Sequence, residues 1–271
     1  MFAFSTETIK ELYLDITESS PIVEEVAEEV HTEDKFLAAE DTWYTTSIDK
    51  ATITSIEIVQ GKCGMGNDEA GVVAGWDASE DKDGSITCRI IGSHLYIYTN
   101  TADGILANIN SAYAFGGFTS VTEITGLEYL DTSYVTDMHW MFGDNHSLQT
   151  ITIPSSWDTS GVLDMSYMFY NDASLKKINL NNLNMLSCED ISYMFGYCSS
   201  LEVLDITEWI YQVVSSMDTA TQMLMQAGSD DFSVIVGSEE MAKWVVGNPR
   251  NAFVNTMLRD DAKIFISSKT P

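Results

Sequence analysis

The sequence predicts an α+β protein: a short solenoid with a brief helix and a strand in each repeat, preceded by a small β-rich region and an acidic helical N-terminal arm. Segments around a Met-Phe pair recur every 26 or 27 residues within residues 113–228, and a fixed period of this length is typical of stacked repeats. The 271 residues are 45% hydrophobic. That is enough apolar material for a core, and it excludes a mostly disordered chain.

Residues 1–41 predict the acidic arm, with 12 acidic side chains against two lysines. Ser20-Pro21 is typical of a helix start, and apolar residues follow at three-to-four spacing from Ile22 to Val30. The apolar stripe is short, so this helix needs a surface to pack on. That surface could be its own domain, a sister chain in a homo-oligomer, or a larger assembly to which the arm is an anchor.

Residues 42–112 predict a small sheet that caps the repeats. Ala51–Val59, Ser85–Ile91 and Leu95–Tyr98 are rich in β-branched and aromatic residues. Turn-forming residues at 61–69 and 77–84 separate them.

The turn at 77–84 carries oxygen-bearing side chains at alternate positions, namely Asp77, Ser79, Asp81 and Asp83. With Gly84 they have the spacing of a calcium loop, but Ile90 stands where an acid should close the loop. A hairpin turn between Trp76 and Ile86 explains the same residues equally well. Calcium is therefore an alternative here, and we expect no other cofactor or metal.

Three stretches define the repeat: Asp137–Phe142, Asp164–Phe169 and Asp190–Phe195. A fainter copy precedes them at Tyr113–Phe115, and a decayed copy follows at 218–223. The first and fourth residues of the Met-x-x-Met-Phe pattern and the Phe share a face in a helical turn. Apolar residues six, nine and eleven positions after the Phe predict a strand with one buried face. Such a unit buries its apolar side only by stacking on its neighbours.

Two residues before each repeat Phe lies an aromatic side chain; these are Tyr113, Trp140, Tyr167 and Tyr193. In a helical turn this position points away from the core, so stacked repeats would align the rings in a row, which we call the aromatic column. Rings with a polar end are good contact residues for proteins or sugars. Alternatively, the rings pack on one another and only shield the repeats.

The outward positions of the expected strands form a polar face, which is either a docking rim or a solvated surface. They are Glu123, Thr125, Thr150, Thr152, Lys177, Asn179, Val203 and Asp205.

Composition narrows the class of partner. The 41 acidic and 13 basic side chains give a net charge of −28, which argues against nucleic acid and anionic lipid as partners. Residues 1–14 lack a signal-peptide pattern, and we expect no membrane insertion. Of the four cysteines, Cys63 and Cys88 could pair, although four reduced thiols are the simpler interpretation.

No residue pattern points to catalysis. The four histidines have no metal-like spacing. The carboxylates are numerous, but none is singled out as the pair that a glycosidase needs. We therefore expect no enzymatic activity, and a carbohydrate-active enzyme is the less favoured alternative.

The repeats contain Leu130-Asp-Thr-Ser-Tyr-Val-Thr-Asp-Met138 and Trp157-Asp-Thr-Ser-Gly-Val162. With these motifs, residues 113–210 resemble the BspA-like leucine-rich repeat surface proteins of bacteria and their phages. The resemblance implies a leucine-rich-repeat fold and a role in adhesion and in contact with a host protein or glycan. It implies exposure on a phage particle, where the arm would contact neighbouring virion proteins, or alternatively on the bacterial cell surface. Residues 229–271 are then an atypical capping unit.

Overall fold

The computed structural model describes residues 37–39, 42–44, 47–61, 71–99, 104–209, 222–247 and 263–266. The chain divides into two units, residues 1–35 and 36–271, and every described residue belongs to the second. The helical arm expected over residues 1–41 therefore lies outside the described residues, apart from 37–39.

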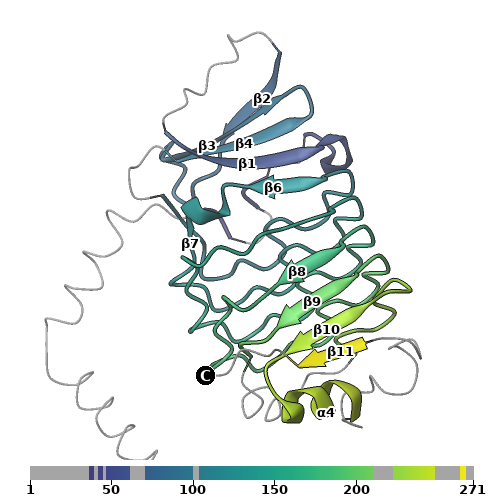
Figure 1. Ribbon diagram of the computed structural model, residues 1–271. Helices are drawn as coiled ribbons and strands as arrows, with labels where there is room; N and C mark the ends of the chain where they lie inside the picture. The colour runs from purple at the N-terminus through teal and green to yellow at the C-terminus, as the bar shows by residue number, and fades with distance from the viewer. Residues whose placement is uncertain are drawn as a thin grey trace, which may run out of the picture. The chain divides into compact units, whose positions relative to one another are not determined.

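The first sheet has five strands in the order β2 (Val72–Asp77), β3 (Ile86–Ile91), β4 (His94–Thr99), β1 (Ser55–Gln60) and β6 (Glu123–Thr125) (Figure 1). A 3-10 turn, η1 (Lys50–Thr52), precedes β1. Strands β2, β3 and β4 pair antiparallel, whereas β1 pairs parallel with both β4 and β6. The alternation of Ile56 and Ile58 in β1 places both side chains in the core.

This sheet continues from the N-terminal region into the first repeat. Strand β6 belongs to the repeat of Phe115, and it pairs with β1 from the preceding region. The N–H of Thr122 also donates to the carbonyl of Thr54 at 3.0 Å. The β-rich region is thus joined to the repeats by backbone hydrogen bonds.

The second sheet is parallel and has the order β11 (Lys263–Ile266), β10 (Ser233–Val236), β9 (Val203–Ile206) and β8 (Lys177–Asn179). A short pair joins β5 (Ile105–Leu106) to β7 (Leu130–Asp131), which follows the 3-10 turn η2 (Leu127–Tyr129). Helix α4 (Glu239–Gly247) follows β10. Its N-terminus is capped by Ser238, whose Oγ accepts from the N–H of Met241 at 3.1 Å.

The expected leucine-rich-repeat solenoid, with a helix and a strand in each repeat, is wrong. The structure is mostly β, and α4 is the one α-helix among the described residues. In the repeats, the backbone φ of Tyr113, Trp140, Tyr167 and Tyr193 lies between 55° and 58°. A right-handed helix needs φ near about −63° at every residue, so these left-handed residues interrupt any helix and leave tight turns.

Each turn has local hydrogen bonds between residues three apart, such as Met141 N–H to the Met138 carbonyl at 3.1 Å, and its other N–H groups donate to the next repeat. The N–H of Phe115 donates to the carbonyl of Met141, and that of Phe142 donates to Met168. Successive repeats are joined in parallel by single bridges, such as Asp137 with Asp164. We call this arrangement the repeat stack, and each repeat in it a rung.

The strands of the rungs are also less regular than expected. Strands β6, β8 and β9 form in three of the repeats, but in the repeat of Phe142 the equivalent segment has only the bridge of Thr150 with Lys177.

The core of the repeat stack is a column of phenylalanine rings. Ring centroids of Phe115 and Phe142 lie 5.6 Å apart, and those of Phe142–Phe169 and Phe169–Phe195 lie 5.5 Å apart, with interplanar angles of 4° to 12°. All four rings are fully buried. The expected alignment of these residues in successive repeats is therefore confirmed, although the turns that carry them are not helical.

The cysteines that the structure describes are buried, free thiols: Cys88, Cys188 and Cys198. Cys63, the partner considered for Cys88, lies outside the described residues. Cys188 occupies the repeat position of the buried Val135 and Val162, as a small core residue.

Candidate functional site

The aromatic column is continuous along the repeat stack. Ring centroids lie 5.9 Å apart for Tyr113–Trp140, 4.8 Å for Trp140–Tyr167 and 4.8 Å for Tyr167–Tyr193, with interplanar angles of 12° to 21°. The structure thus brings all four of the expected binding residues together in one row.

The turn that presents each ring is built by an aspartate. The backbone N–H of His139 donates to Oδ1 of Asp137 at 2.8 Å. Asp164 and Asp190 accept in the same way from the residue two positions on, at 2.7 Å each. This Asx turn is a local alternative to helical hydrogen bonding. It leads the chain into the left-handed residue that carries the ring.

The rings are stacked but not enclosed. Tyr113 is 42% exposed, and the other three are partly buried. Both faces of Trp140 are covered, one by Tyr113 and the other by Tyr167, and Tyr167 is covered in the same way by Trp140 and Tyr193. The rings thus pack on one another, as one of the two alternatives expected, and they remain partly exposed. A contact role for them stays a prediction.

Two further tyrosines widen the column. The ring of Tyr170 lies 4.9 Å from Trp140 and 5.2 Å from Tyr167, and Tyr197 lies 5.3 Å from Tyr170. Sequence reasoning missed both, although the signal was available: at the position of Tyr170, directly after the repeat Phe, the other three repeats have glycine. We call Tyr170, Tyr197 and the aromatic column together the aromatic face.

Glycine at that position makes room for the column. A Cβ added to Gly143 would lie 2.4 Å from Cδ1 and 2.5 Å from Nε1 of Trp140. The Trp140 ring therefore lies directly over Gly143.

A histidine links three rungs beside the column. The Tyr113 hydroxyl lies 3.2 Å from Nε2 of His139, and Nδ1 of His139 lies 2.7 Å from Oγ of Ser166. The His139 ring also meets Tyr113 and Tyr167 edge to face, at 5.4 Å from each. These contacts fix the orientation of the Tyr113 and Tyr167 rings relative to His139.

The acidic side chains of Asp144 and Asp190 give the aromatic face a negative electrostatic environment. Partial burial raises the pKa of Tyr167, and the neighbouring Tyr193 and Asp190 raise it further. Partial burial, Tyr197 and Tyr167 raise the pKa of Tyr170, with a smaller contribution from Asp144. Both hydroxyl groups are thus protonated at neutral pH and can donate hydrogen bonds.

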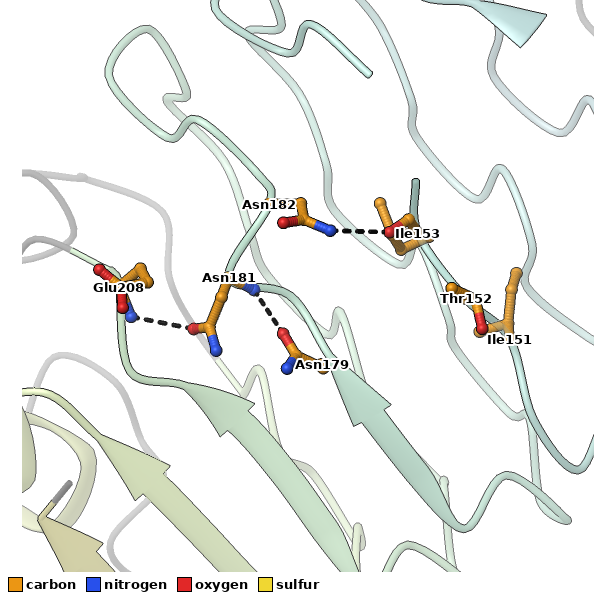
Figure 2. Close-up of a pocket in the computed structure, with 7 residues that line it drawn as sticks. All are labelled: Ile151, Thr152, Ile153, Asn179, Asn181, Asn182 and Glu208. Carbon is orange, nitrogen blue, oxygen red and sulfur yellow. Dashed lines mark hydrogen bonds between the residues drawn. The ribbon is translucent and has the colours of Figure 1, made fainter. Parts of the chain in front are cut away.

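A polar pocket of about 490 Å³ lies on another part of the repeats (Figure 2). Its lining consists of Ile151, Thr152, Ile153, Asn179, Asn181, Asn182 and Glu208. Nδ2 of Asn182 donates to the carbonyl of Ile153 at 2.9 Å, and the N–H of Glu208 donates to Oδ1 of Asn181 at 2.9 Å.

One extra residue accompanies the opening of the pocket. Trp157 follows Ile153 by four residues, whereas in the next repeat the equivalent Leu183 follows Leu180 by three. Pro154, within the longer segment, has no N–H with which to continue a ladder. Of the lining residues, Thr152 and Asn179 were expected on the polar strand face, whereas Asn181, Asn182 and Glu208 were not singled out.

The loop considered for calcium is a hairpin connection between β2 and β3. Asp77 uses both carboxylate oxygens within it: Oδ1 accepts from the N–H of Ser79 at 2.9 Å, and Oδ2 accepts from the N–H of Gly84 at 2.7 Å. Oδ1 of Asp83 accepts from the N–H of Ser85. Asp81 is exposed. Among the described residues, no group of three His, Cys, Asp or Glu side chains is arranged to hold a metal ion.

The strand face is polar and solvated. Six of its eight expected positions are exposed, namely Glu123, Thr125, Thr150, Thr152, Lys177 and Asn179. A search of the described part of the chain finds no helix with the length and apolar character needed to cross a bilayer.

A family model matches part of the chain. Residues 110–233 are similar to a family described as "Mycoplasma protein of unknown function, DUF285". The matched segment is less than half of the 271 residues, and it contains the whole aromatic face. No curated protein and no solved structure matches the chain.

Proposed function

We propose that the chain is a non-enzymatic interaction protein and that the aromatic face is its contact surface. The observation that supports this most directly is a stack of partly exposed aromatic rings that runs unbroken from Tyr113 to Tyr193. Large aromatic side chains are costly to leave in water, and they are enriched in binding surfaces. A surface whose rings already hold one another in place also loses little conformational freedom on binding.

The stacking favours a protein as the partner over a glycan. A sugar ring that packs on an aromatic side chain needs a free ring face, and both faces of Trp140 and of Tyr167 are covered by neighbouring rings. A protein surface can meet the ring edges and bond the tyrosine hydroxyl groups. Asp144 and Asp190 nearby favour a partner with basic groups. A glycan held only by the hydroxyl groups is the second candidate.

The location that we propose is the exterior of a phage particle, where the protein would contact the host surface or neighbouring virion proteins. The support is the resemblance of the repeats to surface proteins of bacteria and phages. The bacterial cell surface is the alternative. Mass spectrometry of purified particles, cell envelopes and cytosol distinguishes them. We expect enrichment in particles; enrichment in envelopes would favour the alternative, and a purely cytosolic protein would contradict both.

An enzymatic role has less support. Glycosidases act with two carboxyl groups on either side of the bond, and the described pocket is lined by a single carboxylate, Glu208. A hydrolysis screen of the purified chain against host-wall glycans tests this. Turnover that Glu208→Gln or another single acid substitution abolishes would contradict the non-enzymatic proposal.

Binding to intact host cells tests the contact surface. We expect the fluorescently labelled Trp140→Ala/Tyr170→Ala double variant to bind about tenfold or more weakly than the wild type, because interface aromatics contribute much of the binding energy. The matched control is Thr150→Ala/Lys177→Ala, which removes two exposed side chains from the strand face. Equal loss in both variants, or no loss in the aromatic variant at unchanged thermal stability, would contradict the proposal.

A further inference from the structure

A column of buried side chains lies three residues after each repeat Phe, and it consists of Phe118, Asn145, Asp172 and Cys198. Asn145, Asp172 and Cys198 are all 0% exposed. The side chains of Asn145, Asp172 and Cys198 each bond to the backbone of the preceding rung. Oδ1 of Asn145 accepts from the N–H of Phe118 at 2.8 Å, and Oδ1 of Asp172 accepts from the N–H of Asn145 at 2.8 Å.

Two of these side chains, Asn145 and Cys198, also donate a hydrogen bond. Nδ2 of Asn145 donates to the carbonyl oxygen of Phe115 at 2.8 Å and to that of Phe142 at 2.6 Å. In the last of these rungs, the Cys198 thiol donates to the carbonyl oxygen of Phe169 at 2.9 Å. Asparagine and cysteine both supply a hydrogen for the Phe carbonyl of the preceding rung, whereas an ionised aspartate has none.

Asp172 is the exception in this column. Its Oδ1 takes the place of Asn145 Oδ1, so its Oδ2 takes the place of the donating Nδ2. This Oδ2 is buried and has no hydrogen-bond partner. In the rungs of Asn145 and Cys198 a carbonyl oxygen is hydrogen-bonded at this place. An ionised oxygen buried here without a partner costs far more free energy than a neutral hydroxyl group that donates to that carbonyl.

The charges around Asp172 act in the same direction as burial. Burial raises the pKa of Asp172 well above its usual range, and Asp144 on the preceding rung raises it further, against the hydrogen bond from Asn145. On the next rung it faces the neutral thiol of Cys198, whose pKa burial and Asp172 raise. His146 is exposed and lies 3.5 Å from Asp144.

We infer that Asp172 is a neutral carboxylic acid in the folded protein, that its Oδ2–H donates to the carbonyl oxygen of Phe142, and that it makes the repeat stack less stable as pH rises. This pH dependence is a property of the protein beyond the proposed contact function. Asp172 follows Tyr170 by two residues and belongs to the rung of Tyr167. Ionisation of Asp172 at higher pH therefore weakens the rung that carries these two rings.

The sign of this pH dependence follows from the linkage between protonation and folding. A carboxyl group whose folded pKa lies above its unfolded value of about 3.9 stabilises the fold fully below that value, and this stabilisation is lost as pH rises through the folded pKa. Between the two values the folding equilibrium constant falls about tenfold for each pH unit.

Asp172→Asn tests the inference, because asparagine restores the donor found at Asn145 without changing the shape of the side chain. Thermal unfolding of the full chain is measured from pH 4.5 to 8. We expect the variant to melt higher than the wild type at pH 8, by a margin that shrinks toward pH 4.5. A margin that does not change with pH, or a lower melting temperature at pH 8, would overturn the inference.

Asp158→Asn is the matched control. Hydrogen bonds from Ser160 lower the pKa of Asp158, which is exposed. Its stabilisation is therefore present above an unfolded pKa of about 3.9 and lost in acid. This variant should lose stability at pH 8 rather than gain it.

A direct measurement does not depend on any variant folding. In the ¹³C-labelled wild-type chain, the chemical shift of the Asp172 carboxyl carbon should move at a higher pH than that of Asp158. Titration of Asp172 together with the exposed carboxyl groups would overturn the inference.

Discussion

The indole Nε1 of Trp43 donates a hydrogen bond to the carbonyl oxygen of Ala114 at 2.8 Å, across 71 residues of sequence. Ala114 belongs to the first rung of the repeat stack. On the second rung the equivalent carbonyl, that of Met141, accepts from the N–H of Phe115. The first rung has no such rung before it, so a side chain supplies the missing donor.

Lys50 acts in the same way two residues along. Its ammonium group donates to the carbonyl oxygen of Gly116 at 2.9 Å and lies 4.8 Å from the centre of the Phe118 ring. Because N–H groups of these turns point toward the following rung, the first rung presents carbonyl oxygens at its open side. A cation and an indole donor both suit such an edge.

Removing the indole donor should destabilise the protein. We expect Trp43→Phe to lower the free energy of unfolding by about 1–3 kcal/mol, because it leaves the Ala114 carbonyl buried and unbonded. Urea denaturation measures the change. Trp140→Phe, in the partly exposed aromatic column, is the control and should lose less. Equal losses would mean that the bond to Ala114 has no special importance.

The two ring columns should differ in their contribution to stability. Phe169 is fully buried between Phe142 and Phe195, so Phe169→Ala should cost about 3–5 kcal/mol. Tyr167→Ala, two residues earlier on a partly exposed ring, should cost much less. Chemical denaturation of both variants decides this. If the losses were equal, the aromatic column would belong to the core and its contact role would be dropped.

Filling the space beneath Trp140 should disturb the aromatic column. Gly143→Ala places a methyl group 2.4 Å from the Trp140 ring, so we expect the ring to move out of the stack and its fluorescence to change. At Gly161 the nearest atom to an added Cβ is 3.6 Å away, which is ordinary contact, and Gly161→Ala should leave the spectrum unchanged. Identical spectra for Gly143→Ala and the wild type would contradict the observed packing.

Tyr44 should make the protein sensitive to alkali. Its hydroxyl group is buried without a partner, and burial, with a smaller contribution from Asp49, raises its pKa from 10.0 to about 12. A phenol with a raised folded pKa stabilises the fold below pH 10, and this contribution is lost as pH rises toward 12. We expect Tyr44→Phe to be as stable as the wild type at pH 7 and more stable at pH 11. Melting curves at both values test this, and a parallel decline of the two proteins would contradict it.

The helix prediction failed for a definite reason. Apolar residues at Met138, Met141 and Phe142 have helical spacing, but a pair of tight turns also buries residues three and four apart. The left-handed φ of 55° at Trp140 separates the two cases, and nothing in its residue type predicts it, because L-residues with large side chains rarely adopt this conformation.

The strands at Ile56–Ile58 and Cys88–Ile90 were predictable, since β-branched residues with a buried face determine them locally. The candidate site was predictable in part. The column from Tyr113 to Tyr193 follows from the repeat period alone. The covering of the ring faces, the addition of Tyr170 and Tyr197, and the pocket at Asn181 required the stacked rungs.

By itself, then, the sequence determined the period, the buried rows and the alignment of the rings, because burying apolar side chains at a fixed spacing permits few arrangements. Only the tertiary structure decided the backbone of the turns, the donor for Ala114 and the unpartnered oxygen of Asp172. The last two depend on hydrogen bonds between residues at least 26 positions apart, which leave no local pattern in the chain. The turns combine local bonds with bonds to the next rung.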